Sequence, residues 1–233
     1  MSVKTRTTSP RSTASRPQNL YIIGGIIATA VVIALLVIIV SGNSGTAADP
    51  QRFAGIPQSR TADGGFVVGN PDAPITLVEF ADYKCPACHE YKPTIEEFID
   101  RFVVTGMAKF EYRTIMTAGG QLTGYAYQLA ECTEEQRQGA FWESYEVLFE
   151  YGTRGGYDQQ MARPLSERLN LNLSELLTCV PTAKQITTDQ ALAQQLGVTG
   201  TPTVFIRYGD GDPMPLPTGR DIDTLALLVE TAQ

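Results

Sequence analysis

The longest uninterrupted apolar segment of the chain lies near its N-terminus. Residues 20–40, LYIIGGIIATAVVIALLVIIV, carry no charged side chain. As a helix, this segment would span about 30 Å, the thickness of a bilayer core. A cleavable signal peptide is the alternative, but its apolar region usually has about 7–15 residues, and only a weak cleavage site follows, at Thr46-Ala47-Ala48. The length therefore favours an uncleaved transmembrane anchor over residues 20–40.

Charges flank this segment unevenly. Residues 1–19 contain Lys and Arg but no acid, are rich in Ser, Thr and Pro, and are expected to form a disordered tail. Asp49 follows the apolar segment. The positive-inside rule then places the tail in the cytoplasm and residues 41–233 outside it. Cysteines in that compartment can be oxidised and stay oxidised.

The pattern changes after the apolar segment. Residues 41–64 are rich in Gly, Ser, Ala and Asp and are expected to be a linker into a folded domain over 65–233, which starts with a short strand near 65–68. The β-branched, apolar run ITLVEF at Ile75–Phe80 predicts a buried strand, although it includes the charged Glu79. Apolar residues at helical spacing then predict a helix from Pro86 to about Val104.

The second half of the domain also contains segments with strand alternation and segments with helical spacing of apolar residues. The alternating residues 107–116 predict a strand, and residues 121–196 are helical in character, with an apolar stripe that includes Phe141, Tyr145 and Phe149. Thr203–Tyr208 predicts another strand before a hairpin and a final helix. This order predicts an α/β domain in which a helical block is inserted into a small sheet.

Cys85 and Cys88 lie between the predicted buried strand and the predicted helix. A helix N-terminus presents unpaired N–H groups and a positive dipole potential, which favour a thiolate at the first cysteine and make it nucleophilic. Cys88 lies one turn further along the same face and could attack a mixed disulfide formed at Cys85. The spacing and the context predict a redox-active pair.

Two other interpretations of the pair remain open. A structural zinc needs four ligands, but the chain has no second Cys-x-x-Cys and only His89 as a histidine, so no metal is expected. A purely structural disulfide would close a very short loop and add little stability. The acidic net charge of −7 also fits poorly with binding to nucleic acid, which requires concentrated basic residues.

Three stretches resemble the DsbA-like family of thioredoxin-fold thiol:disulfide oxidoreductases. They are GNPDAPITLVEFADYKCPACHEYKPTIEEFI at 69–99, LAECTEEQRQGAFWESYEVLF at 129–149 and GVTGTPT at 197–203. The resemblance covers roughly residues 65–231. It implies a thioredoxin-like fold with the helical insertion between the second strand and the strand after a cis-proline.

The resemblance also assigns roles to individual residues. Cys85 would be the exposed nucleophile and Cys88 the buried resolving cysteine. Pro202 matches the cis-proline opposite the pair, and the backbone at Thr201 would bind an incoming peptide as an added strand. Glu79 matches a buried acid whose raised pKa would let it exchange a proton with Cys88. The alternative for Glu79 is that strand alternation turns it to solvent.

The chain departs from DsbA between the two cysteines. DsbA has Pro-His there, whereas this chain has Pro86-Ala87. Ala87 has no donor or charge for the thiolate, so the disulfide is expected to be less oxidising than that of DsbA. His89 either adds positive charge to the pair when protonated or is an exposed bystander, and both interpretations stay open.

The two remaining cysteines, Cys132 and Cys179, fall in the helical block. In an oxidising compartment they most simply pair with each other, as a structural disulfide. Some members of the family carry a similarly placed bond.

These features together predict a membrane-anchored, extracytoplasmic dithiol oxidase that needs no cofactor. Its substrates would be reduced exported proteins, and a membrane redox partner would reoxidise it. A disulfide reductase or isomerase on the same pair is the alternative, and a non-catalytic binding or metallochaperone module is another. A monomer is expected.

Overall fold

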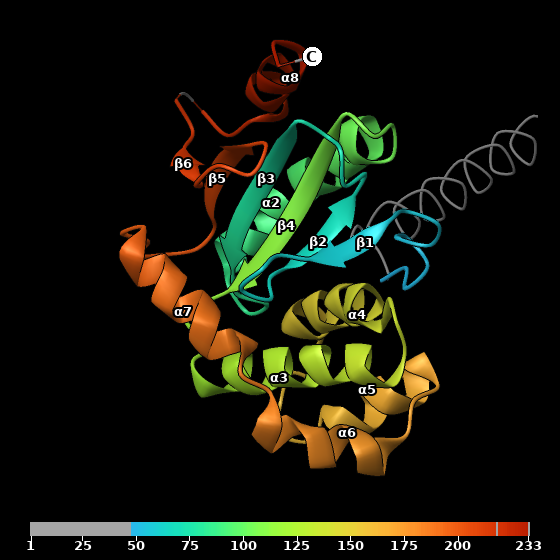
Figure 1. The fold of residues 1–233 in the computed structure, drawn as a ribbon. Helices are drawn as coiled ribbons and strands as arrows, with labels where there is room; N and C mark the ends of the chain where they lie inside the picture. Colours follow the sequence, from blue (N-terminus) through green and yellow to red (C-terminus); the bar gives the residue numbers. More distant parts are fainter. Residues whose placement is uncertain (1–47, 218, 233) are drawn as a thin grey trace, which may run out of the picture. The chain divides into compact units, whose positions relative to one another are not determined.

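The computed structural model describes residues 48–217 and 219–232, and the predicted tail and anchor lie outside them. The described residues form a six-stranded sheet with helices around it (Figure 1). Among them, no helix has both the length and the apolarity to cross a bilayer. In chain order, the strands are β1 (Gln58–Arg60), β2 (Phe66–Gly69), β3 (Ile75–Ala81), β4 (Ala108–Thr114), β5 (Thr203–Tyr208) and β6 (Met214–Pro215).

The predicted strand at Ile75–Phe80 is the centre of the sheet. The order across the sheet is β1-β2-β4-β3-β5-β6. β3 pairs in parallel with β4 and antiparallel with β5, and the other neighbouring strands are antiparallel. All residues of β3 are buried, which explains why the segment reads as an almost continuous apolar run.

The two faces of β3 pack into different clusters. Ile75 and Leu77 belong to the large core, whereas Val78 and Phe80 belong to a smaller cluster beside α7 (Gln185–Gln195). Side chains alternate along a strand, so Glu79 lies on the same face as Ile75 and Leu77. Both faces of the strand are covered, and Glu79 therefore does not turn to solvent.

The helix after β3 carries the two cysteines. α2 (Pro86–Phe98) buries Cys88, Tyr91, Ile95 and Phe98 against the core and lies behind the sheet in Figure 1. The sequence predicts one continuous helix to Val104, but the last part is a π-helical segment, η1 (Ile99–Val103). The apolar positions continue through both segments, and the pattern alone does not reveal the wider turn.

The helical block lies between β4 and β5, as expected, and gathers on one side of the sheet (Figure 1). The aromatic stripe on α4 is core: Phe141, Tyr145 and Phe149 are buried, and Phe141 stacks on Phe66 of β2 with 3.4 Å between ring centroids. The elements that follow β4 are α3 (Gln121–Gln136), α4 (Ala140–Arg154), α5 (Ala162–Leu169), α6 (Leu173–Cys179) and η2 (Val180–Thr182), before α7; α8 (Ile222–Glu230) follows β6.

The described part of the predicted linker, residues 48–64, is folded onto the domain, so the predicted boundary at residue 65 was wrong. β1 forms the edge of the sheet against β2. Phe53 is 1% exposed, and its ring centroid lies 4.9 Å from that of Trp142. A single aromatic residue and a three-residue strand give too short a pattern to identify in a Gly- and Ala-rich segment.

A buried ionic cluster fastens α7 to the sheet. The guanidinium of Arg113 on β4 donates to Glu111 at 2.7 Å, to Asp189 on α7 at 2.9 Å and to Asp63 at 2.7 Å. Burial would raise the pKa of Asp63, but hydrogen bonds from Arg113 and Thr61 outweigh it and lower that pKa to about 2. The cluster fixes the helix that leads into the loop containing Pro202.

Candidate active site

Cys85 and Cys88 lie at the N-terminus of α2, where the sequence places them. Cys85 is the N-cap residue and Pro86 is the first helical residue. The N–H groups of Cys88 and His89 donate to the carbonyl oxygen of Cys85 at 3.0 and 3.2 Å. The pair is in the dithiol form. The pair therefore lies at the positive end of the helix dipole.

The two cysteines differ in exposure, but less than expected. Cys88 is 1% exposed and Cys85 only 8%, so the expectation of an exposed Cys85 was wrong for this form of the protein. The reason is the loop before β5. The Cys85 thiol donates to the carbonyl oxygen of Thr201 at a sulfur–oxygen distance of 3.3 Å.

That loop has the backbone conformation that the resemblance implies. The Thr201–Pro202 peptide bond is cis. The Thr201 carbonyl lies beside the Cys85 sulfur, although the two residues are 116 positions apart in the chain. The structure thus brings Cys85, Cys88, Thr201 and Pro202 together, while their roles in catalysis remain predictions.

Glu79 lies beneath the pair, inside the core. It is 2% exposed, and its Oε2 atom is buried without a hydrogen-bond partner among the described residues. Burial raises the pKa of Glu79 to about 8, against the opposing charges of Lys92 and Arg220. A carboxyl with such a pKa can both hold and release a proton near neutral pH.

The pKa of the Cys88 thiol is raised strongly, mainly by burial and in part by the neighbouring Glu79. A backbone hydrogen bond at Asp82 and a side-chain hydrogen bond from Thr201 act in the opposite direction. Cys88 therefore favours the protonated thiol. Ionisation of Cys88 requires a nearby group that accepts its proton. The charge of Glu79 acts on Cys88, so the Glu79 carboxylate is the candidate for that group.

Asp82, which the sequence does not single out, organises the loops around the pair. It is fully buried. One carboxylate oxygen accepts from the Lys84 N–H at 2.8 Å and the Thr123 hydroxyl at 2.6 Å. The other accepts from the Thr117 N–H at 2.8 Å, the Thr117 hydroxyl at 3.0 Å and the Gly119 N–H at 3.0 Å. One side chain thus binds the cysteine loop, the loop after β4 and helix α3.

Helix α4 packs closely against the loop before the cysteines. A Cβ atom at Gly152 would lie 2.0 Å from the carbonyl oxygen of Tyr83 and 2.9 Å from Nε2 of His89. Lys84 Nζ also donates to the Gly152 carbonyl at 2.9 Å. Only glycine permits this approach, and the contact couples the helical block to the active-site loop.

His89 is a packing residue in this structure. Its Nε2 lies 2.8 Å from the Tyr83 carbonyl oxygen, and a carbonyl can only accept, so Nε2 carries the hydrogen. Burial lowers the pKa of His89 despite that hydrogen bond. The imidazole is therefore neutral at neutral pH and adds no positive charge to the pair.

Arg220 is the second residue near the site that the sequence does not indicate. Its Nη1 donates to the Pro202 carbonyl at 2.7 Å, and its guanidinium lies 4.9 Å from the ring centroid of Tyr91 on α2. The Tyr91 hydroxyl donates to the Arg220 carbonyl at 2.8 Å. Arg220 therefore joins the cis-proline loop to the helix that bears the cysteines.

The remaining cysteines form a disulfide away from the pair. Cys132 on α3 is bonded to Cys179 at the end of α6, with their Cα atoms 5.8 Å apart. This is the pairing expected from the sequence. It joins two helices of the inserted block.

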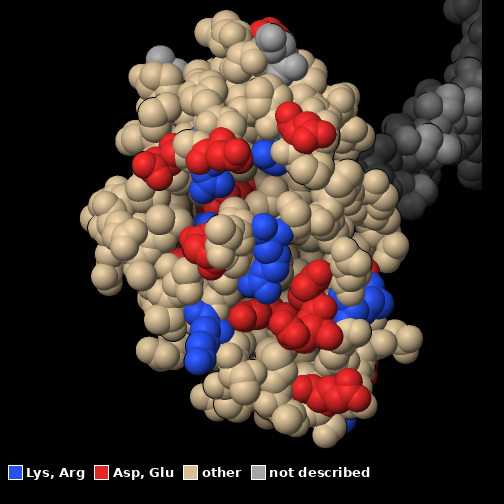
Figure 2. Space-filling model, in the orientation of Figure 1, with Lys and Arg blue, Asp and Glu red and all other residues tan. Residues whose placement is uncertain are grey.

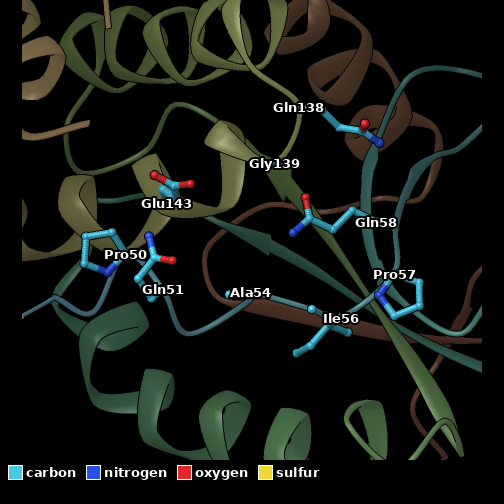
Figure 3. A pocket seen from close by; sticks show the side chains of 10 residues that line it. Pro50, Gln51, Ala54, Ile56, Pro57, Gln58, Gln138, Gly139 and Glu143 are labelled. Atoms are coloured by element: carbon cyan, nitrogen blue, oxygen red, sulfur yellow. The ribbon is translucent and has the colours of Figure 1, made fainter. Parts of the chain in front are cut away.

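Neither cysteine of the pair lines the cavities described below. The cavity in Figure 3 lies between the segment before β1 and the start of α4, and Gln51, Gln58 and Glu143 line it. A second cavity, beside β4 and β5, is lined by Arg60, Lys109 and Arg207 among others. On the face shown in Figure 2, basic and acidic side chains are interspersed. The pair lies next to the cis-proline loop, which covers Cys85.

Comparison with known proteins decides the family. The model of a family described as "Thioredoxin" matches residues 61–210, more than half of the chain. The chain belongs to the thioredoxin family. This thioredoxin-family domain includes all the site residues named above except Arg220, and the expected thioredoxin-like fold is confirmed.

Relatives of known name support the resemblance to DsbA. Disulfide bond formation protein D of Bacillus subtilis is 31% identical over 152 residues, which cover 60% of this chain and 66% of that protein. The Na(+)/H(+) antiporter NhaA 3 of Salinispora tropica is also 31% identical, over 62% of this chain but 22% of the antiporter. The matches therefore cover less than two thirds of these relatives.

Solved structures agree with this assignment. The crystal structure of oxidised BdbD from Bacillus subtilis has a TM-score of 0.59 at 25% identity, covering 71% of this chain and 91% of that one. The structure of Wolbachia pipientis alpha-DsbA1 has a TM-score of 0.61 at 18% identity, covering 74% and 92%. The second likeness shows the shared fold alone.

Proposed function

We propose that this chain is a protein thiol:disulfide oxidase that acts outside the cytosol and introduces disulfides into exported proteins through Cys85 and Cys88. The observation that carries the proposal is the position of the pair at the N-terminus of α2, with the Cys85 sulfur beside the carbonyl before a cis-proline. The name of the Bacillus subtilis relative supports disulfide formation as the reaction.

The reaction starts from the Cys85–Cys88 disulfide. A substrate thiolate attacks the Cys85 sulfur, the bond between the two cysteines breaks, and Cys88 leaves as a thiolate. Glu79, whose pKa of about 8 keeps it protonated near neutral pH, supplies the proton to Cys88, through water where the two are not in contact. A second substrate thiolate then attacks the substrate sulfur of the mixed disulfide and releases Cys85, so the substrate is oxidised and the pair is reduced.

The position of the pair beside the cis-proline loop fits a protein substrate. An extended segment of an unfolded protein can hydrogen-bond to the backbone at Thr201 as an added strand, which gives affinity without strong sequence preference. Pro202 holds that backbone in place, and Arg220 binds its carbonyl. Reduced, unfolded exported proteins are the substrate class that needs this kind of binding.

The proposed compartment rests on two features. Residues 20–40 have the length of a membrane anchor. Basic residues precede them, and the positive-inside rule favours a cytoplasmic position for such residues. The Cys132–Cys179 bond supports an oxidising compartment, because structural disulfides are rare in the cytosol. Anchoring would hold the domain close to a membrane redox partner, which would reoxidise the pair.

The activity is tested with a reduced protein such as ribonuclease A. Wild-type protein with the Cys85–Cys88 disulfide should regenerate active ribonuclease, and neither Cys85→Ala nor Cys88→Ala, which cannot form that disulfide, should do so. Both variants keep the Cys132–Cys179 bond as an internal control. Oxidation that survives in Cys85→Ala would reject catalysis by the pair, and an absence of oxidation by the wild type would favour a non-catalytic binding or metallochaperone role.

The direction of electron flow and the compartment need separate measurements. Equilibration with glutathione gives the reduction potential of the pair; a value near the thioredoxin level of about −270 mV would favour a reductase or isomerase instead. Protease added to spheroplasts should digest the domain of the full chain if it lies outside the membrane. Protection until the membrane is lysed would place it in the cytosol.

A further inference from the structure

A tyrosine of the cysteine helix binds a residue that lies against the cis-proline loop. Tyr91 is on α2, about one turn beyond Cys88, and is 7% exposed. Its hydroxyl donates to the backbone carbonyl oxygen of Arg220 at 2.8 Å. The ring of the same tyrosine lies 4.9 Å from the guanidinium of Arg220. Tyr91 therefore contacts both the backbone and the side chain of Arg220.

The guanidinium of Arg220 reaches the cis-proline loop at Pro202. Its Nη1 atom donates to the Pro202 carbonyl oxygen at 2.7 Å. Pro202 directly follows Thr201, whose backbone is the proposed binding position of a substrate strand. The loop is also closed on itself, because the Thr203 hydroxyl donates to the Gly200 carbonyl oxygen at 2.7 Å. The position of the Pro202 carbonyl and that of the Thr201 backbone are therefore linked.

The backbone at Thr201 has to keep its position relative to the cysteines. The Cys85 sulfur lies 3.3 Å from the Thr201 carbonyl oxygen. A substrate segment that pairs with this backbone must present its own sulfur to Cys85 at the same time, so a small displacement of the loop lowers the reaction rate. Tyr91 is on the helix that begins at Cys85, and the contacts through Arg220 connect the loop to that helix.

We propose that Tyr91 is a positioning residue for peptide substrates, which acts through Arg220 to keep the cis-proline loop in place against the cysteine helix. The inference rests on the proposed function, because it concerns a substrate segment that binds as an added strand at Thr201. A thiol without a peptide group forms no such strand and does not depend on the position of this backbone. Tyr91 therefore favours peptide thiols over small thiols.

Removal of the Tyr91 hydroxyl should slow the reaction with peptides. Tyr91→Phe deletes the donor to the Arg220 carbonyl and keeps the ring that lies beside the guanidinium. The loss of one hydrogen bond changes an equilibrium by roughly two- to tenfold. Because the loop keeps its other contacts, we expect a fall of about threefold in the rate with a peptide. Arg220→Met, which removes the donor to Pro202, should lower that rate at least as much.

The experiment measures second-order rate constants for reduction of the Cys85–Cys88 disulfide in the full chain. The two reductants are an unstructured peptide with two reduced cysteines and dithiothreitol, which has no peptide group. The readout is the ratio of the peptide rate constant to the dithiothreitol rate constant, which Tyr91→Phe should lower about threefold. Tyr125→Phe is the matched control, because Tyr125 lines a cavity formed by residues of α3, α5 and α6; it should keep the wild-type ratio.

The double variant tests whether Tyr91 acts through the guanidinium. If it does, Tyr91→Phe should not change the ratio in the Arg220→Met background. An unchanged ratio in Tyr91→Phe alone, an equal loss with both reductants, or a further fall of the ratio in the Arg220→Met background would overturn the inference. If the wild type does not oxidise the peptide, the proposed function falls as well; a wild type that oxidises it, with variants that keep the wild-type ratio, rejects the Tyr91 role alone.

Discussion

Arg220 Nη1 donates a hydrogen bond of 2.7 Å to the carbonyl oxygen of Pro202. The guanidinium also opposes the effect of burial on the pKa of Glu79. Arg220→Met should therefore raise that pKa further above about 8. The carboxyl carbon NMR shift of Glu79, followed against pH in the oxidised protein, measures the change. Arg101→Met is a matched control, because its guanidinium also lies 4.9 Å from a ring centroid, that of Phe102; an equal shift in both variants would contradict the assignment.

Glu79 should make the stability of the protein depend on pH in a definite direction. The pKa of Glu79 is about 8 in the folded state and 4.5 in the reference state, so between these values the folded protein binds more protons than the unfolded chain. The contribution of Glu79 is fully present below pH 4.5 and is lost as the pH rises, at a rate of up to about 1.4 kcal/mol per pH unit.

Glu79→Gln should remove this loss. Urea unfolding of the oxidised protein at several pH values gives the comparison, since the oxidised pair does not titrate. Glu90→Gln, which changes an exposed residue just after the Cys85–Cys88 motif, should keep the wild-type slope. A Glu79→Gln protein whose stability falls with pH as steeply as wild type would show that Glu79 titrates normally.

Gly152→Ala should destabilise the protein although alanine favours a helix. The new Cβ would lie 2.0 Å from the Tyr83 carbonyl oxygen, and backbone must move to relieve this overlap, at a cost of about 1–3 kcal/mol. Gly124→Ala is the control within α3, because there the Cβ meets the flexible end of Met116. Chemical unfolding should show a loss for Gly152→Ala and a smaller change for Gly124→Ala; the reverse order would refute the close contact.

The Cys132–Cys179 bond should contribute to stability and not to exchange. Replacing both residues by alanine should lower the free energy of unfolding by about 2–5 kcal/mol. The folded double variant should still oxidise reduced ribonuclease at the wild-type rate, because the bond joins α3 to α6 within the helical block. A variant that is folded yet inactive would assign the second disulfide a part in the reaction.

The sequence predicted the parts of the structure that depend on local pattern. The strand at Ile75–Phe80, the cysteines at a strand–helix junction and the inserted helices all follow from periodicity and neighbouring residues. The family resemblance added the proline opposite the pair, since nothing in the spacing of residues 200–203 indicates a cis bond. Glu79 is buried only because both faces of β3 are covered. That coverage depends on the order of the strands in the complete sheet, which the sequence of β3 alone does not indicate.

The parts that were missed depend on contacts between distant residues. Asp82 meets Thr123 across 41 positions and Thr117 across 35, and a buried aspartate looks the same in a sequence as an exposed one. Arg220 reaches Tyr91 across 129 positions. The burial of Cys85 was also missed, because the Thr201 carbonyl that covers it becomes its neighbour only in the folded chain.

The cysteine motif is synthesised well before the cis-proline loop that completes the active site. Cys85 and Thr201 are separated by 116 positions, and β5 must join β3 before the cis-proline loop can lie over the thiol. A chain emerging from the ribosome or a translocation channel therefore exposes its own reactive dithiol long before the segment that will shield it has been made. This interval leaves the four cysteines of the chain open to mispairing, and early closure of the helical block would shorten it.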